Sequence, residues 1–102
     1  MTIQQQWRIK AAHILVDTEA MAQQCIDWIN ESDPEVQAQC FMNLAGMHSK
    51  CSSFMQGGEL DEFGPGEMHK PFEQAVCRLR PGQWTNKPVQ TPFGWHVIAR
   101  IT

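Results

Sequence analysis

The chain has 102 residues, of which 42% are hydrophobic, and eight Lys and Arg oppose eleven Asp and Glu for a formal charge of −3. This composition is typical of one folded domain with its own core, and the lack of a basic excess argues against nucleic-acid binding. The apolar runs are too short to cross a membrane, and the N-terminal residues lack the apolar core of a secretory signal. We therefore expect a cytoplasmic protein.

A strand is expected first, over residues 8–16. Successive strand residues point to opposite faces of a sheet. The two alternating sets here, apolar apart from one histidine, are Ala11, His13 and Leu15, and Ala12, Ile14 and Val16. Both faces of this strand should be buried.

Two helices should follow. Asp17 or Thr18 can cap the first, which we expect to end near Asn30. Asp33 followed by Pro34 is typical of the start of the second. The expected apolar stripes are Met21, Cys25, Trp28 and Ile29 in the first helix and Cys40, Phe41, Leu44 and Ala45 in the second.

The middle of the chain predicts a bend, a short strand and a third helix. Residues 48–58 show no period and end in two glycines, a short strand is expected over 59–63, and residues 64–68 (GPGEM) form a turn. The third helix should begin at Pro71 and end before Pro81. Its apolar stripe is Phe72, Ala75, Val76 and Leu79.

The C-terminal residues predict a hairpin, with strands over 88–91 and 95–101 around the sequence Pro92-Phe93-Gly94. Gly94 can adopt the positive φ that a tight turn needs. The order of elements is strand, two helices, strand, helix and two strands. This order predicts an α+β domain with a four-stranded sheet and helices around it.

Four cysteines, Cys25, Cys40, Cys51 and Cys77, include no C-x-x-C pair. This spacing favours neither a zinc site nor a redox dithiol, so we expect free thiols and no metal or cofactor. Cys25, Cys40 and Cys77 are interpreted as small core residues. Cys51 is considered with the histidines.

Two histidines, His13 and His96, lie in otherwise apolar strands at opposite ends of the chain. Burying an unpaired imidazole costs a few kcal/mol. If the first and last strands are neighbours, each ring can pair with the other, and Thr91 and Cys51 are candidates for the next partners. The alternative is two unrelated core or edge histidines.

Five segments resemble, in order and spacing, the motifs of parvulin-type peptidyl-prolyl cis/trans isomerases. They are AAHILV (11–16), HSKCSS (48–53), GGELDEF (57–63), GPGEMHKPF (64–72) and TPFGWHVI (91–98). The resemblance implies an FKBP-like parvulin fold, a curved four-stranded antiparallel sheet surrounded by helices. We expect a single domain over 1–102, with residues 1–7 as an N-terminal extension, that works as a monomer of the single-domain bacterial type.

The resemblance also implies a site for X-Pro segments of unfolded or partly folded polypeptides, in which the prolyl bond rotates without covalent catalysis. The catalytic positions of the family fall on His13, Cys51, Thr91 and His96. Its proline pocket falls on Leu60, Met68 and Phe72, with Phe93 adding a wall. On spacing alone, Met68 and Phe72 are more often ordinary core and Leu60 could equally be core, so their place in the pocket depends on the resemblance.

The residue before proline should not need a phosphate. Members that bind phosphate carry a basic loop before the paired glycines, whereas the loop here, SSFMQ (52–56), has no Arg or Lys and offers Phe54 and Met55. Acidic residues should surround the site. They are Glu59, Asp61, Glu62 and Glu67. We therefore expect uncharged, apolar or basic residues before proline to be preferred.

Two other functions are compatible with the same residues. One is a non-catalytic proline-peptide-binding chaperone module that keeps the groove without the rate enhancement. The other is a cysteine-dependent hydrolase using Cys51, which the lack of a recognisable oxyanion loop or orienting Asn disfavours.

Overall fold

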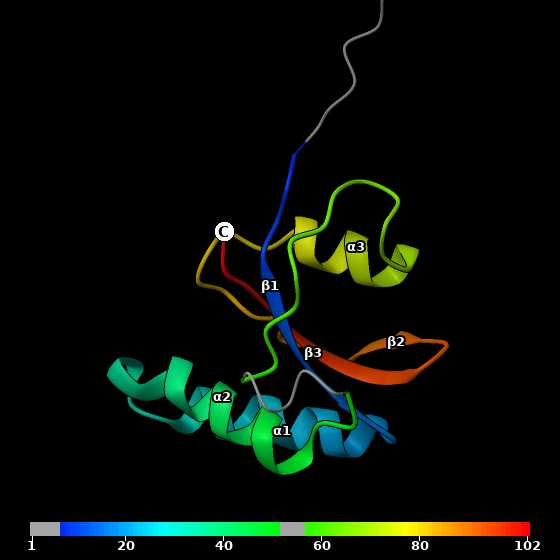
Figure 1. Ribbon diagram of the computed structural model, residues 1–102. Coiled ribbons are helices and arrows are strands. Elements are labelled where there is room, and N and C mark those ends of the chain that lie inside the picture. Colours follow the sequence, from blue (N-terminus) through cyan, green and yellow to red (C-terminus); the bar gives the residue numbers. More distant parts are fainter. Residues whose placement is uncertain (1–6, 52–56) are drawn as a thin grey trace, which may run out of the picture.

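The computed structural model describes residues 7–51 and 57–102. Within these residues, three strands form an antiparallel sheet in the order β1-β3-β2. The strands are β1 (Ala11–Val16), β2 (Val89–Thr91) and β3 (Gly94–Arg100), and the helices are α1 (Glu19–Glu31), α2 (Gln37–His48) and α3 (Lys70–Cys77). Helices α1 and α2 cover one face of the sheet and α3 covers the other (Figure 1). The predicted α+β class is confirmed.

The helices begin close to their predicted caps. The hydroxyl of Thr18 accepts a hydrogen bond of 3.1 Å from the backbone N–H of Met21 at the start of α1. Before the second helix, Asp33 makes no side-chain capping bond, and Pro34 opens a short 3-10 helix, Pro34–Val36. The backbone of Val36 then leaves helical geometry (φ −117°, ψ 9°), so α2 itself begins only at Gln37.

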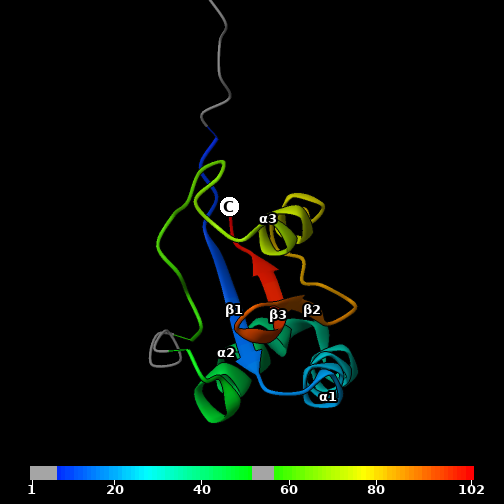
Figure 2. The same cartoon turned by 90° about the vertical axis from the view of Figure 1, so that its right-hand side faces the viewer.

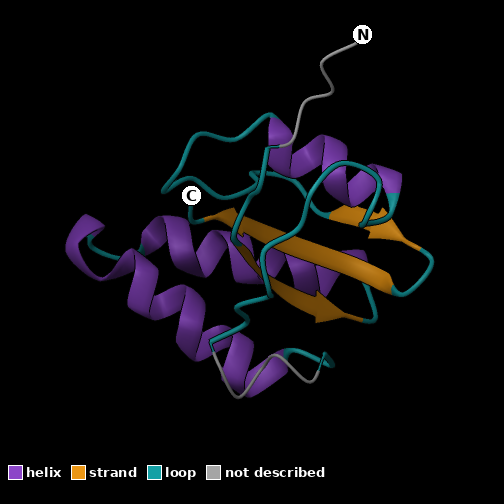
Figure 3. Cartoon of the chain, turned by 45° about the horizontal axis from the view of Figure 1, so that its top comes forward, coloured by secondary structure: helices purple, strands orange, loops and turns teal. Residues whose placement is uncertain are grey.

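Two apolar clusters lie on opposite faces of the sheet, as the alternation in the first strand predicts. The cluster under α1 and α2 consists of Ala12, Ile14, Val16, Ala22, Cys25, Ile26, Ile29, Phe41, Leu44, Ala45 and Val97. The cluster under α3 consists of Ile9, Ala11, Phe63, Phe72, Val76 and Ile98. Figure 3 shows the strands between these helical layers. One face of each strand therefore belongs to α3, and this is the face that carries both histidines.

Two side chains predicted to be core are exposed, and four others are only half-buried: Met21, Cys40, Ala75 and Leu79. Trp28 is 40% exposed and stacks on His48 at the end of α2, with ring centroids 5.9 Å apart, while Ile26 takes the buried place. Cys77 is exposed at the end of α3, because this short helix buries only Phe72 and Val76.

The predicted strand over 59–63 is wrong: the segment runs along β1 but makes only two isolated bridges, Ala12 to Glu59 and Ile9 to Phe63 (Figure 2). Between these two bridges, the chain entering β1 advances by three residues, from Ile9 to Ala12, whereas the bridged segment advances by four, from Glu59 to Phe63. The extra residue on one side interrupts the regular ladder, as in a β-bulge. The four-stranded sheet is therefore reduced to three strands and a bridged segment.

The C-terminal hairpin is confirmed. Thr91 pairs with Gly94 across a two-residue loop of Pro92 and Phe93, and Gly94 has φ +144°. A Cβ at this glycine would lie 2.7 Å from the carbonyl oxygen of Val16. Because it has no side chain, Gly94 lets β3 lie close to Val16 at the end of β1.

Gly58 controls how the bridged segment meets β1. Its φ is +84°, its carbonyl accepts the backbone N–H of His13 at 2.9 Å, and a Cβ here would lie 2.4 Å from the carbonyl oxygen of His13. Gly66 has a similar φ of +80°, but a Cβ added there would meet no atom within 4 Å. An alanine at Gly66 therefore measures the cost of the positive φ alone, whereas an alanine at Gly58 adds the cost of the clash with His13.

We expect Gly58→Ala to lower the free energy of unfolding by about 3 kcal/mol and Gly66→Ala by only about 1 kcal/mol. The difference arises because a backbone oxygen beside His13 cannot move without disturbing β1. Urea unfolding of both variants measures the two costs. Equal costs would show that the contact with His13 is unimportant.

Candidate active site

A pocket of about 430 Å³ opens on the α3 face of the sheet. Its walls are His13, Leu15, Cys51, Leu60, Glu67, Met68, His69, Phe72, Thr91, Phe93 and His96, which we call the histidine pocket. All eight site residues inferred from the sequence line it. Glu67, expected among the acidic residues around the site, is also in the wall. Sequence reasoning missed Leu15 and His69, although the strand alternation already places Leu15 on the face of His13.

The register of the sheet brings the two histidines together. Strands β1 and β3 pair directly, with His13 opposite Ile98 and Leu15 opposite His96. The two imidazoles are therefore diagonal neighbours on one face, with ring centroids 5.1 Å apart and 22° between the planes. Phe72 from α3 packs edge-on against both, at 5.7 Å from His13 and 5.5 Å from His96. The expected neighbourhood of first and last strands is confirmed.

A hydrogen-bonded chain runs through these rings. Nδ1 of His13 lies 2.9 Å from Nδ1 of His96, and Nε2 of His96 lies 2.6 Å from the hydroxyl oxygen of Thr91. The same hydroxyl oxygen accepts the backbone N–H of Phe93 at 3.2 Å. Thr91 is thus the predicted partner at one end of the pair.

The Thr91 hydroxyl already accepts the N–H of Phe93, which leaves its own proton free to donate. If the Thr91 hydroxyl donates to Nε2 of His96, then Nδ1–H of His96 donates to Nδ1 of His13, and the proton of His13 resides on Nε2. This arrangement uses every polar atom of the chain except Nε2 of His13. That atom is buried and has no hydrogen-bond partner among the described residues.

Cys51 does not complete the other end of the chain, contrary to the prediction. Its backbone is held next to β1, since the neighbouring Lys50 N–H donates to the carbonyl of Leu15 at 2.7 Å and the Ser49 hydroxyl accepts the N–H of Leu15 at 3.0 Å. This anchorage places Cys51 in the pocket wall without a hydrogen bond to His13 among the described residues. The loop over 52–56, including Phe54 and Met55, lies outside the described residues.

Both histidines are uncharged at neutral pH. Burial lowers the pKa of His13 from its ordinary value of 6.5 to about 4. Burial, together with the neighbouring His13 and His69, lowers the pKa of His96 to about 4. His13 is only 5% exposed and His96 only 3%, so a positive charge on either ring would be poorly solvated.

These shifts predict a pH-dependent stability. An unfolded histidine titrates near pH 6.5, so between about pH 6.5 and pH 4 the unfolded chain binds more protons than the folded one. The free energy of unfolding should therefore fall as the pH falls through this window. Urea unfolding between pH 7.5 and pH 5 tests this. In the variant His13→Gln/His96→Gln, the free energy of unfolding should depend less steeply on pH than in the wild type. Identical slopes in the two proteins would contradict it.

The rest of the pocket is apolar with a charged rim. Phe72 belongs to the cluster under α3, and Leu60 and Met68 pack against that cluster. Phe93 is 67% exposed at the hairpin turn and packs edge-on against His69, with ring centroids 5.0 Å apart. At the rim, Glu67 accepts a hydrogen bond of 2.8 Å from Arg8, and the predicted acidic residues Glu59, Asp61 and Glu62 are exposed.

The described residues lack two other kinds of feature. No group of three or more His, Cys, Asp or Glu side chains is arranged to hold a metal ion among them. None of the helices in residues 7–51 and 57–102 is long and apolar enough to span a bilayer.

Comparison with known proteins places this pocket in a family. The family model described as the rotamase PPIC-type PPIase domain matches residues 13–102. Among curated relatives, foldase protein PrsA 4 of Bacillus cereus is 38% identical over 92 residues, which cover 89% of this chain and 30% of PrsA 4. The chain thus spans less than a third of the length of that relative.

Solved structures show the same relationship. One of the SurA-like chaperones PEB4 and Cj1289 of Campylobacter jejuni has a TM-score of 0.87 at 38% identity, covering 93% of this chain and 38% of that chain. The parvulin NmPin of Nitrosopumilus maritimus has a TM-score of 0.75 at 32% identity, covering 93% of this chain and 96% of NmPin. The fold of this chain therefore matches both a domain of longer proteins and a protein of similar length.

Proposed function

Because this chain belongs to the PPIC-type peptidyl-prolyl cis/trans isomerases, we propose that the histidine pocket accelerates rotation about X-Pro bonds in unfolded or partly folded polypeptides. The observation that supports this activity best is the apolar pocket beside two hydrogen-bonded, uncharged imidazoles. The resemblance of the five sequence motifs to parvulins is confirmed by the family match.

The reaction needs no bond to break. The barrier to rotation of a peptide bond is about 18 to 20 kcal/mol, because amide resonance is lost, and uncatalysed X-Pro bonds isomerise in tens to hundreds of seconds. The twisted transition state is less polar than either planar state, since the carbonyl loses dipole as the nitrogen regains its lone pair. An acceleration of about 10⁴-fold requires about 5.4 kcal/mol of preferential binding of that state.

The apolar residues of the pocket can supply much of this preference. Leu60, Met68 and Phe72 would hold the pyrrolidine ring, while the preceding carbonyl rotates on the side of the histidines. Burial of the ring removes water from the twisted amide. Phe93, exposed at the turn, would close over the proline as the outer wall.

The paired histidines would position the rotating amide and set the polarity around it, without carrying a charge. Their neutral state keeps a full positive charge away from the twisted amide, whose polarity is reduced, and Thr91 fixes the orientation of His96. Cys51 would adjust the polarity of the wall without forming a covalent intermediate. Four residues thus take the catalytic roles in this proposal, namely His13, Cys51, Thr91 and His96.

The substrate should be an X-Pro segment with an uncharged, apolar or basic residue before proline, with no requirement for phosphate. Glu67, the carboxylate in the wall of the histidine pocket, supports this preference by repelling an acidic residue. We also propose that the chain forms a single domain over 1–102 with an extension over 1–7. It would work as a cytoplasmic monomer, with no nucleic-acid, membrane or cofactor partner.

A panel of peptides tests the activity and the preference together. We expect the protein to accelerate isomerisation of Ala-Pro, Leu-Pro and Lys-Pro peptides in a protease-coupled assay, with kcat/KM for Glu-Pro and phospho-Ser-Pro lower by roughly tenfold. Peptide affinity measured in parallel distinguishes the chaperone module, which would bind without acceleration. Glu-Pro as the best substrate would overturn the preference while leaving the activity intact.

A further inference from the structure

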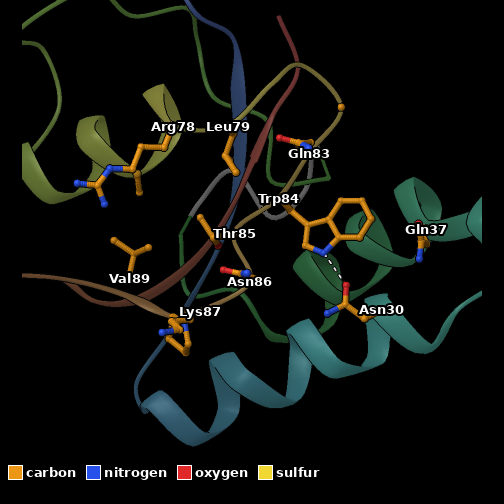
Figure 4. Close-up of a pocket in the computed structure, with 13 residues that line it drawn as sticks. Asn30, Gln37, Arg78, Leu79, Gln83, Trp84, Thr85, Asn86, Lys87 and Val89 are labelled. Carbon is orange, nitrogen blue, oxygen red and sulfur yellow. Dashed lines mark hydrogen bonds between the residues drawn. The ribbon is translucent and has the colours of Figure 1, made fainter.

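A second pocket, larger than the histidine pocket, lies between α1, α3 and the loop over 80–88 (Figure 4). Its volume is about 790 Å³. We call it the donor pocket, and its lining includes Asn30, Arg78, Gln83, Trp84, Asn86 and Lys87. Nothing in the proposed isomerase chemistry uses these residues.

The donor pocket is cationic in a protein of net charge −3. Arg78 and Lys87 both line it, and among the residues that the structure describes no Asp or Glu does. The two ion pairs among the described residues involve other cations, Arg8 and Lys50. Arg78 and Lys87 therefore remain available to an anionic group from outside.

Two amides in the wall are oriented to donate hydrogen bonds. The indole N–H of Trp84 can only donate, and it reaches Asn30 at 3.0 Å, so the side-chain oxygen of Asn30 faces the indole. The backbone N–H of Arg80 likewise reaches the side-chain oxygen of Gln83 at 2.9 Å. Figure 4 shows the bond from Trp84 to Asn30 as a dashed line. The NH₂ groups of Asn30 and Gln83 are left without a partner among the described residues.

A ligand that fits this wall must be rich in acceptors. Backbone carbonyls can accept from the NH₂ groups, carboxylates can pair with Arg78 and Lys87, and Leu79 and Val89 give the pocket an apolar part. We propose that the donor pocket binds an extended acidic segment of a polypeptide. Two cations on an otherwise acidic protein favour a peptide over a nucleic acid, which needs a broad basic surface.

The two pockets are close enough for one polypeptide to reach both. Helix α3 contributes Phe72 to the histidine pocket. Arg78, which directly follows this helix, lines the donor pocket about 9 Å from Phe72 along the helix axis. Strand β2 contributes Val89 to one pocket and Thr91 to the other. An extended chain rises about 3.3 Å per residue, so an acidic segment a few residues from a proline could occupy both. This link to a proline substrate rests on the proposed function, whereas binding at the donor pocket does not.

A proline-free peptide with a run of Asp and Glu, and its Asn and Gln counterpart, test the site directly. We expect only the acidic peptide to shift the NMR signal of the Trp84 indole N–H. Its affinity should fall when salt is raised from about 0.1 M to about 1 M. The variant Arg78→Glu/Lys87→Glu should weaken binding by roughly tenfold or more, while isomerisation of a short Ala-Pro peptide stays unchanged.

The matched control is Lys50→Glu/Lys70→Glu, which makes the same change in net charge at exposed cations outside the donor pocket and its loop. It should leave affinity within about twofold of wild type. The proposal is overturned if both variants weaken binding equally, if the neutral peptide binds as well, or if an oligonucleotide binds more tightly than the acidic peptide. None of these outcomes depends on isomerase activity, so a failure here is distinct from a failure of the proposed function.

Discussion

Met68→Ala should lower kcat/KM for X-Pro isomerisation by about 10- to 100-fold. Burying a side chain of this size is worth about 1.5 to 3 kcal/mol, and in the proposed mechanism that burial favours the twisted proline over free substrate. Met68 is half-buried in the wall of the histidine pocket, so its truncation should disturb the fold less than truncation of buried Phe72. A protease-coupled assay at low substrate concentration measures the effect.

Val76→Ala is the control for Met68→Ala, since Val76 is fully buried in the cluster under α3 but does not line the pocket. This variant should lose about 2 kcal/mol of stability while its folded fraction keeps kcat/KM within about twofold of wild type. Phe72→Leu provides a second pocket variant with a smaller risk of unfolding than alanine. Full activity in Met68→Ala would show that proline binds elsewhere.

His96→Leu should destabilise the fold by about 2 to 4 kcal/mol, because it leaves both Nδ1 of His13 and the hydroxyl of Thr91 buried without their partner. His13→Leu should cost less, since only Nδ1 of His96 loses a partner. The double variant should cost less than the sum of the two, by about 1 to 3 kcal/mol, because the histidine pair is then removed as a unit. Additive costs would show that the bond between the rings contributes nothing.

The measurement is urea unfolding at pH 7.5, at which both imidazoles are neutral and their titration does not enter the comparison. The two single variants and the double variant form a double-mutant cycle. A second such cycle, with His96→Leu and Thr91→Val, isolates the hydrogen bond at Nε2 of His96. The valine keeps the shape of threonine and removes its hydroxyl. Coupling in both cycles would support a continuous chain from Thr91 to His13.

Local patterns predict the elements with mixed success. The cap at Thr18 and the hairpin around Gly94 follow from neighbouring residues alone, and both are present. The strand over 59–63 is wrong because alternation of side chains says nothing about an extra residue in the pairing with β1. The prediction of Trp28 as a core residue fails because helical spacing cannot show where a neighbouring helix ends.

For the site, the sequence by itself determined which chemical groups are available: two histidines in apolar strands and a set of apolar residues at family positions. Only the tertiary structure decided that the rings meet through Nδ1, that Thr91 rather than Cys51 is a partner, and that Nε2 of His13 is unpaired among the described residues. The reason is physical. Residue type and periodicity act over a few neighbours in the chain, whereas a hydrogen bond between positions 13 and 96 depends on strand register and side-chain rotation, which the packing of the whole domain sets.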